Sequence, residues 1–128
     1  MRLLLDTCTF LWVITGSARL PAHLRASIAD PAAEVYVSVV SAWEIALKWS
    51  RQRLVLAEPP DRLVPAQRRA HGLAELPLDE ASALHLTRLP PLHADPFDRM
   101  LVSQAIVHGL VIATPDELVA QYPARTVW

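Results

Sequence analysis

Short apolar runs alternate with stretches of helical periodicity along this chain, and few folds accommodate that alternation. Residues 3–5, 35–37 and 110–113 have the length and the aliphatic or β-branched composition of buried strands. The segments between them carry residues that start and end helices, among them Pro and Gly. Strands separated by helices are typical of an α/β fold around a central parallel sheet, and we predict that fold class.

Capping residues predict where several of the helices begin. Ser41 and Glu44 have the S-x-x-E spacing of a capping box, so we expect a helix from there to about residue 51. Asp95, followed by Pro96, is predicted to cap a helix that ends at Gly109. Other helices are expected to begin at Thr7 or Thr9, Pro21, Pro65, Asp79 and Asp116.

Length and composition limit the class of protein. The chain has 128 residues, 52% of them apolar, which suffices for a hydrophobic core, and we expect one domain over residues 1–128. The single cysteine, Cys8, excludes an internal disulfide framework and a cysteine-based metal cage. No apolar stretch reaches the roughly 18–20 residues of a membrane span, and no signal-peptide cleavage pattern follows the N-terminal run. We expect a cytoplasmic protein without membrane association.

The charge balance argues against one mode of nucleic-acid binding. Twelve basic residues against thirteen acidic ones give a formal net charge of −1. A protein that binds nucleic acid mainly through bulk charge has a strong basic excess, so that mode is disfavoured. Contacts through a few arginines or through a bridging metal ion remain compatible with this composition.

Four acidic residues fall near the ends of predicted strands or the starts of predicted helices: Asp6, Glu44, Asp98 and Asp116. Asp6 and Asp116 follow the apolar runs 3–5 and 110–113, and the carboxyl ends of parallel strands meet at one edge of a sheet. Glu44 and Asp98 are expected to reach that edge from the first turns of their helices. Carboxylates gathered there raise one another's pKa unless a cation neutralises them.

An oxygen-only cluster favours Mg²⁺ or Mn²⁺ over softer metals. One or two such ions lower the pKa of a bound water and clamp a phosphate oxygen, which is what phosphodiester hydrolysis requires. Thr114, two residues before Asp116, is a candidate for orienting that water. His93 shows no ligand spacing, so a structural or supporting role is expected for it.

Each acid also has a structural interpretation. Asp116 fits the N-cap role that Asp often plays, and Glu44 fits a capping box or an ion pair with Lys48. Asp6 ends an apolar strand, where neither a helix-interior nor a surface role accounts for it, so we favour function. Of the two acids flanking Pro96-Phe97, we expect Asp95 to cap the helix and Asp98 to face the site.

The segments LLLDTC, SAWEIALK, HADPFDRMLVSQA and IATPDELVAQY, in this order, resemble PIN domains of the VapC toxin type. The resemblance spans essentially the whole chain, and HADPFDRMLVSQA is its most specific part. It implies a PIN-like α/β/α sandwich with a central parallel sheet.

The resemblance also implies site residues. The family's four acidic metal ligands fall on Asp6, Glu44, Asp98 and Asp116. Asp98 rather than Asp95 matches the third acid, because Ala105 occupies the small-residue position seven places further on. Asp95 is expected to contribute through a water, and Thr114 matches the hydroxyl residue that precedes the fourth acid. Arg99 is a candidate for contacting phosphate or orienting a carboxylate.

In function, the resemblance implies an Mg²⁺- or Mn²⁺-dependent endoribonuclease that is the toxin of a toxin–antitoxin pair. Such a toxin cuts tRNA or rRNA and thereby inhibits translation. The implied partners are a second copy of the chain and a small VapB-like antitoxin that covers the active site. Operator DNA is expected to be bound only through the antitoxin.

Two other interpretations were weighed. Haloacid-dehalogenase-like phosphatases also place an Asp after the first strand, but they need a second Asp where this chain has Cys8. A PIN-like module that binds RNA or protein without cutting is the non-enzymatic alternative. The complete acidic set argues against it, because unused clustered carboxylates only destabilise a fold.

Overall fold

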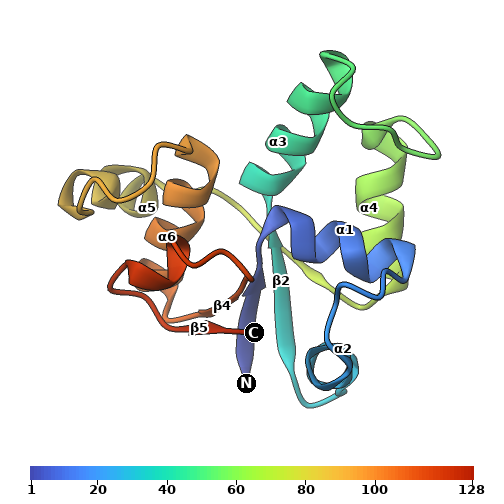
Figure 1. The fold of residues 1–128 in the computed structure, drawn as a ribbon, viewed down its shortest axis with the longest axis horizontal. Helices are drawn as coiled ribbons and strands as arrows, with labels where there is room; N and C mark the ends of the chain where they lie inside the picture. Colours follow the sequence, from blue (N-terminus) through green and yellow to red (C-terminus); the bar gives the residue numbers. More distant parts are fainter.

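The computed structural model describes residues 1–128, built around one parallel sheet (Figure 1). The strand order is β3-β2-β1-β4-β5, and every neighbouring pair is parallel. The strands are β1 (Arg2–Leu5), β2 (Glu34–Ser38), β3 (Ala74–Leu76), β4 (Val111–Ala113) and β5 (Thr126–Val127). The three apolar runs of the sequence form β1, β2 and β4, which are the centre of the sheet. The edge strand β5 was not anticipated from the sequence.

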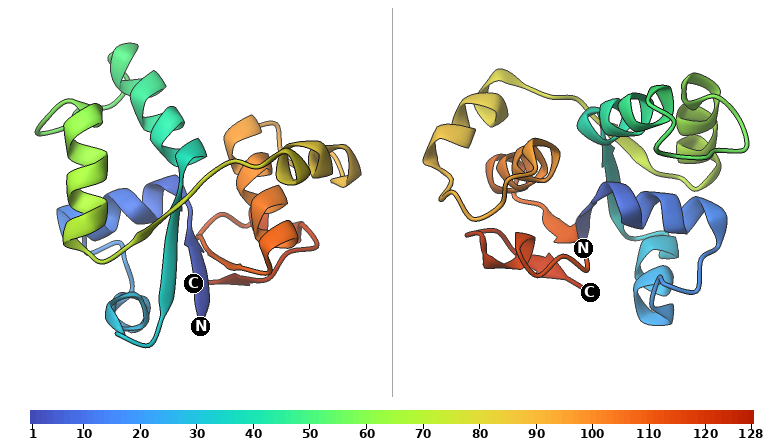
Figure 2. Two further views of the ribbon diagram at one scale, coloured as in Figure 1. Left: turned by 180° about the vertical axis from the view of Figure 1, so that it is seen from behind. Right: turned by 45° about the horizontal axis from the view of Figure 1, so that its top comes forward.

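Helices connect the strands and cover both faces of the sheet. They are α1 (Thr7–Thr15), α2 (Ala22–Ala29), α3 (Val39–Ser50), α4 (Pro60–Ala70), α5 (Glu80–His85) and α6 (Pro96–His108), with short 3₁₀ turns η1 (Leu86–Arg88) and η2 (Val119–Gln121). In Figure 1, α1, α2 and α4 lie on one side of the sheet and α5 and α6 on the other. The reverse view in Figure 2 shows the same separation. None of these helices has the length and apolar character needed to cross a bilayer.

The alternation of side chains along β1 explains the two layers. Leu3 and Leu5 belong to the core cluster that contains residues of α1 and α2, whereas Leu4 belongs to the cluster that contains residues of α6. All three leucines are fully buried, because successive side chains of a strand point to opposite faces and both faces are covered. The predicted α/β/α sandwich with a central parallel sheet is confirmed.

Three helix starts differ from the sequence-based expectation. Ser38, not Ser41, is the N-cap of α3, so Ser41 and Glu44 are not a capping box and Glu44 lies in the second turn. Helix α4 begins at Pro60, where a missing N–H costs nothing, and Pro65 lies inside it. Asp116 starts a turn followed by η2 instead of an α-helix. Only at α3 did a nearby capping residue, Ser38, replace the predicted one.

The strand order reverses at one position of the sheet, and we call the region outside the carboxyl ends of β1 and β4 there the crevice. From β1 the chain first builds one side (β2, β3) and later the other (β4, β5), so the order reverses between β1 and β4. Ligands of open parallel sheets bind at such a reversal, outside the carboxyl ends of the strands. Leu5 pairs with Ala113 there, and the Asp6 amide donates to the Ala113 carbonyl at 3.2 Å. The residues after β1 and β4 therefore share this crevice.

A buried hydroxyl at the end of β2 offers a test of the packing. Ser38 Oγ accepts from the Val40 amide at 3.0 Å and donates to Gln104 Oε1 of α6 at 2.6 Å. We expect Ser38→Ala to lower the free energy of unfolding by about 2 kcal/mol, through loss of the cap and of Gln104's partner. Chemical denaturation measures this change. Ser50→Ala, at the exposed end of the same helix, should change it by less than about 0.5 kcal/mol, and equal effects would contradict the argument.

Candidate metal and nuclease site

Asp6 lies at the junction of β1 and α1 and has two functions in the structure. It is the N-cap of α1, and its Oδ1 accepts from the Thr9 amide at 2.9 Å and from Cys8 Sγ at 3.3 Å. Neither Thr7 nor Thr9 is the cap. The expectation that no local role accounts for Asp6 is therefore wrong. Its Oδ2 has no hydrogen-bond partner in the protein, so this buried side chain caps with one oxygen and offers the other to the crevice.

Glu44 is held in place from two elements. Thr7 Oγ1 of α1 donates to Glu44 Oε1 at 2.6 Å, and Ser41 Oγ lies 2.9 Å from the same Thr7 oxygen. Lys48, one turn further along α3, forms an ion pair with Glu44 Oε2. That contact raises the pKa of Lys48. The structural alternative of a Glu44–Lys48 pair is thus real, and it places a cation beside a carboxylate that is only 4% exposed.

Asp98 shows the strongest electrostatic perturbation of the acidic residues in this crevice. Burial raises its pKa to about 7, and the negative charges of Asp95, Asp6 and Glu44 add to the increase, while His93 opposes it. As expected, Asp95 caps α6, with its Oδ1 2.8 Å from the Phe97 amide. Since three other carboxylates influence Asp98, the crevice concentrates negative charge that a cation would relieve.

Hydrogen bonds within the turn after β4 fix the position of Asp116. Its amide donates to Thr114 Oγ1 at 3.1 Å, and its Oδ1 accepts from the Leu118 amide at 2.9 Å. Thr114 is buried, and by accepting from the Asp116 amide its hydroxyl oxygen helps to form the turn after β4. The hydroxyl hydrogen of Thr114 remains available for donation. Asp116 Oδ2 points to His93 Nε2 at 3.0 Å.

His93, for which the sequence suggested only a structural or supporting role, lies between two of the predicted acids. Its Nε2 lies 3.2 Å from Asp98 Oδ2 and 3.0 Å from Asp116 Oδ2, so it links two of the four predicted acids. These three side chains are the one group of possible ligand atoms that lie within 4.8 Å of one another. The available signal was its position in the segment HADPFD, two residues before the cap of α6.

Two further side chains, Arg99 and Cys8, follow two of the acids closely in sequence and were considered for a role in the site. Arg99 follows Asp98 and makes no ion pair, and its Nε is buried without a hydrogen-bond partner. For Cys8, burial and the nearby Asp6 charge raise the pKa to about 12, so the thiol stays protonated and is no nucleophile.

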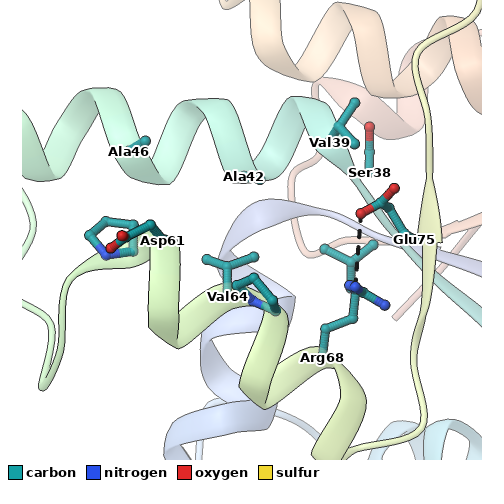
Figure 3. Close-up of a pocket in the computed structure, with 11 residues that line it drawn as sticks. Ser38, Val39, Ala42, Ala46, Asp61, Val64, Arg68 and Glu75 are labelled. Atoms are coloured by element: carbon teal, nitrogen blue, oxygen red, sulfur yellow. Dashed lines mark ion pairs between the residues drawn. The ribbon is translucent and has the colours of Figure 1, made fainter.

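A cavity of about 280 Å³ lies elsewhere, between α3 and α4 (Figure 3). It is lined mainly by apolar side chains, with Arg68 and Glu75 paired at 3.8 Å along its edge. None of the four predicted acids lines it. Trp43 and Trp49 of α3 are exposed, Trp43 by 60%, and the Trp43 ring packs edge-to-face with Phe97, with ring centroids 4.9 Å apart.

The donor chemistry of the crevice fits a hard divalent cation. The structure brings Asp98 and Asp116 together at His93 Nε2, whereas Asp6 and Glu44 lie outside that group of ligand atoms and act on Asp98 through their charges. The one thiol, Cys8, stays protonated. Oxygen ligands of this kind suit Mg²⁺ or Mn²⁺.

Comparison with known proteins places this geometry in context. The profile of the PIN domain family matches residues 3–124. Among curated proteins, none matches the sequence significantly.

Several solved structures share the fold over almost the whole chain. VapBC2 from Rickettsia felis, bound to a DNA fragment of its promoter, matches with a TM-score of 0.75 at 13% identity, covering 99% of this chain and 98% of that one. DNA-bound VapBC from Salmonella typhimurium gives 0.67 at 17% identity and coverages of 99% and 97%. VapBC-1 from nontypeable Haemophilus influenzae gives 0.66 at 14%, with the same coverages. At such identities the likeness establishes the fold.

Proposed function

Because this chain belongs to the PIN domain family, we propose that it is a divalent-metal-dependent endoribonuclease that acts as the toxin of a toxin–antitoxin pair. The observation that carries the proposal is the acidic crevice at the β1–β4 reversal. Burial raises the pKa of Asp98 to about 7 there, and the negative charges of neighbouring carboxylates add to the increase. A fold keeps such mutually repelling groups together when a ligand cation uses them.

In this proposal Asp6, Glu44, Asp98 and Asp116 hold Mg²⁺ or Mn²⁺. When bound, the ion supplies an acidified water and a clamp on a phosphate oxygen, which is the chemistry of phosphodiester hydrolysis. Asp98 must lose its proton to become a ligand, so metal binding is expected to release a proton from this carboxyl. Thr7 and Lys48 fix Glu44, and the Thr9 amide fixes Asp6.

The substrate is proposed to be cellular RNA, with tRNA or rRNA as the class whose cleavage inhibits translation. Arg99, the residue after Asp98, is proposed to contact a substrate phosphate. Asp95 and Thr114 support the ligands through the α6 cap and the turn after β4. This role places the protein in the cytoplasm.

The partners are proposed from the solved complexes of the same fold. The structures from Rickettsia felis and Salmonella typhimurium are VapBC assemblies bound to DNA. By analogy we propose that this chain forms a homodimer and binds a VapB-like antitoxin, and that operator DNA is contacted through the antitoxin. The formal net charge of −1 agrees with a chain that does not bind DNA by its own bulk charge.

The proposal predicts metal-dependent RNA cleavage. Purified protein free of antitoxin should convert total RNA to discrete fragments in Mg²⁺ or Mn²⁺, and EDTA should stop the reaction. Gel analysis with end mapping measures cleavage and locates the sites. If folded protein binds RNA or a partner equally well with and without metal and cuts nothing, the chain is a binding module instead.

A further inference from the structure

We propose that His93 is a positioning residue that holds Asp98 and Asp116 together by donating its Nε2–H to Asp116 with Asp98 close beside it, and that it is not itself a metal ligand. The inference rests on the proposed metal site and assigns a role that the four acids alone do not explain. It starts from the two distances at Nε2, 3.2 Å to Asp98 Oδ2 and 3.0 Å to Asp116 Oδ2.

The other ring nitrogen determines where the proton lies. The backbone amide of Asp95 donates to His93 Nδ1 at 3.1 Å. A nitrogen that accepts an amide hydrogen carries a lone pair and no proton, so the neutral ring has its hydrogen on Nε2. The Nε2–H then faces two carboxylate oxygens, which are acceptors. Both contacts of the ring agree on the same tautomer.

The ring is held firmly enough for this tautomer to matter. The His93 amide donates to the Tyr122 hydroxyl at 2.9 Å, and Tyr122 is buried in the core cluster that contains residues of α6. The His93 side chain itself is 16% exposed. Backbone, Nδ1 and Nε2 are therefore each bound to a different partner, which leaves the imidazole little freedom to rotate.

Ligation by His93 conflicts with these contacts. The atoms of His93, Asp98 and Asp116 lie close enough for a three-ligand metal site. Binding a metal through Nε2 requires a lone pair there, which moves the proton of a neutral ring to Nδ1. That proton would face the Asp95 N–H, donor against donor, at a spacing of 3.1 Å between the nitrogens. The structure therefore favours the donor role.

The consequence is a preassembled pair of carboxylates. Asp98 and Asp116 come from α6 and from the turn after β4, and the same Nε2 keeps one oxygen of each close to the other. Asp98 Oδ1 has no hydrogen-bond partner in the protein, whereas Asp116 Oδ1 accepts from the Leu118 amide and offers a cation only its second lone pair. Loss of a group that orients metal ligands typically weakens metal binding about 10–100-fold.

Two substitutions separate the functions of the two ring nitrogens. In His93→Asn the side-chain oxygen takes the place of Nδ1 and still accepts from the Asp95 amide, but nothing reaches the carboxylates. In His93→Gln the amide nitrogen takes the place of Nε2 and still donates to them. We expect H93N to weaken Mg²⁺ binding about tenfold or more, and H93Q to stay within about threefold of the parent. His23→Asn, at an exposed histidine, is the control.

Titration calorimetry with Mg²⁺ measures these affinities without RNA. Circular dichroism establishes that each variant is folded, and His93→Ala replaces H93N if the latter does not fold. Parent-like affinity in H93N, or a greater loss in H93Q than in H93N, would overturn the positioning role.

The tautomer is observable directly. Long-range ¹H–¹⁵N spectra distinguish a protonated Nε2 from a protonated Nδ1, and we expect Nε2–H both before and after Mg²⁺ is added. A shift of the proton to Nδ1 on adding Mg²⁺ would show that His93 is a ligand, against the proposal. Neither readout uses RNA, so failure to cleave RNA would sink the proposed nuclease while leaving the role of His93 intact.

Discussion

Replacing Asp6 with Asn is expected to reduce metal-dependent RNA cleavage at least about 100-fold while leaving the free energy of unfolding nearly unchanged. Asn removes one negative charge from the proposed metal site at almost constant volume, and a metal ligand stabilises the transition state by several kcal/mol. The fold survives because Asn is as good an N-cap as Asp. Its side-chain oxygen can still accept from the Thr9 amide, as Asp6 Oδ1 does at 2.9 Å.

Asp6→Ala is the matched comparison for this experiment. It removes both the charge and the cap of α1, so it should lose cleavage and also about 1 kcal/mol of stability. Initial rates on a mapped RNA substrate, together with urea denaturation, separate the two effects. If D6N cuts RNA as fast as the parent, Asp6 is only a cap and the assignment of the site is wrong.

Replacing Asp98 with Asn is expected to stabilise the metal-free protein at pH 8 while abolishing its response to Mg²⁺. Burial in the folded state raises the pKa of Asp98 to about 7 from its ordinary value of 3.8. The folded protein therefore holds this proton more tightly than the unfolded chain does. Stability from this group is complete below about pH 4 and is lost as pH rises towards about 7.

The size of the effect follows from the desolvated charge. Above pH 7 the folded parent contains an ionised, partly buried carboxylate among other acids, and Asn removes that penalty. We expect D98N to gain roughly 1–2 kcal/mol at pH 8, less than the full pKa shift implies because the side chain keeps some solvent contact. At pH 4 the gain should vanish.

Urea denaturation in EDTA at several pH values measures this difference between D98N and the parent. Asp30→Asn, at an exposed Asp outside the crevice, is the control and should not change the slope. In the parent, Mg²⁺ should restore stability at pH 8 by binding the folded state, and in D98N it should not. A D98N protein that is less stable than the parent at pH 8 would show that Asp98 is stabilising as an anion.

Local sequence determined much of this protein. The aliphatic runs form the three central strands because buried parallel strands need continuous apolar residues. Asp79 and Asp95 cap α5 and α6 as predicted, and Gly16 and Gly109 end helices in the left-handed conformation. These signals act over three or four residues and need no tertiary partner. The acids that follow β1 and β4 could be placed at one edge of the sheet because the carboxyl ends of parallel strands meet there.

The tertiary structure decided which side-chain atoms of those residues are hydrogen-bonded within the protein and which remain available to a ligand. Thr7 reaches Glu44 across 37 residues of sequence, and His93 reaches Asp116 across 23, so no local pattern encodes either contact. The choice of Ser38 over Ser41 as a cap depended on where β2 ends and on Gln104 of α6. Hydrogen bonding and burial depend on what surrounds a group in space, and so does the raised pKa of Asp98, which results from burial and neighbouring charges. The sequence alone therefore indicates an acidic site, whereas the fold determines which oxygens that site can offer and which residues orient them.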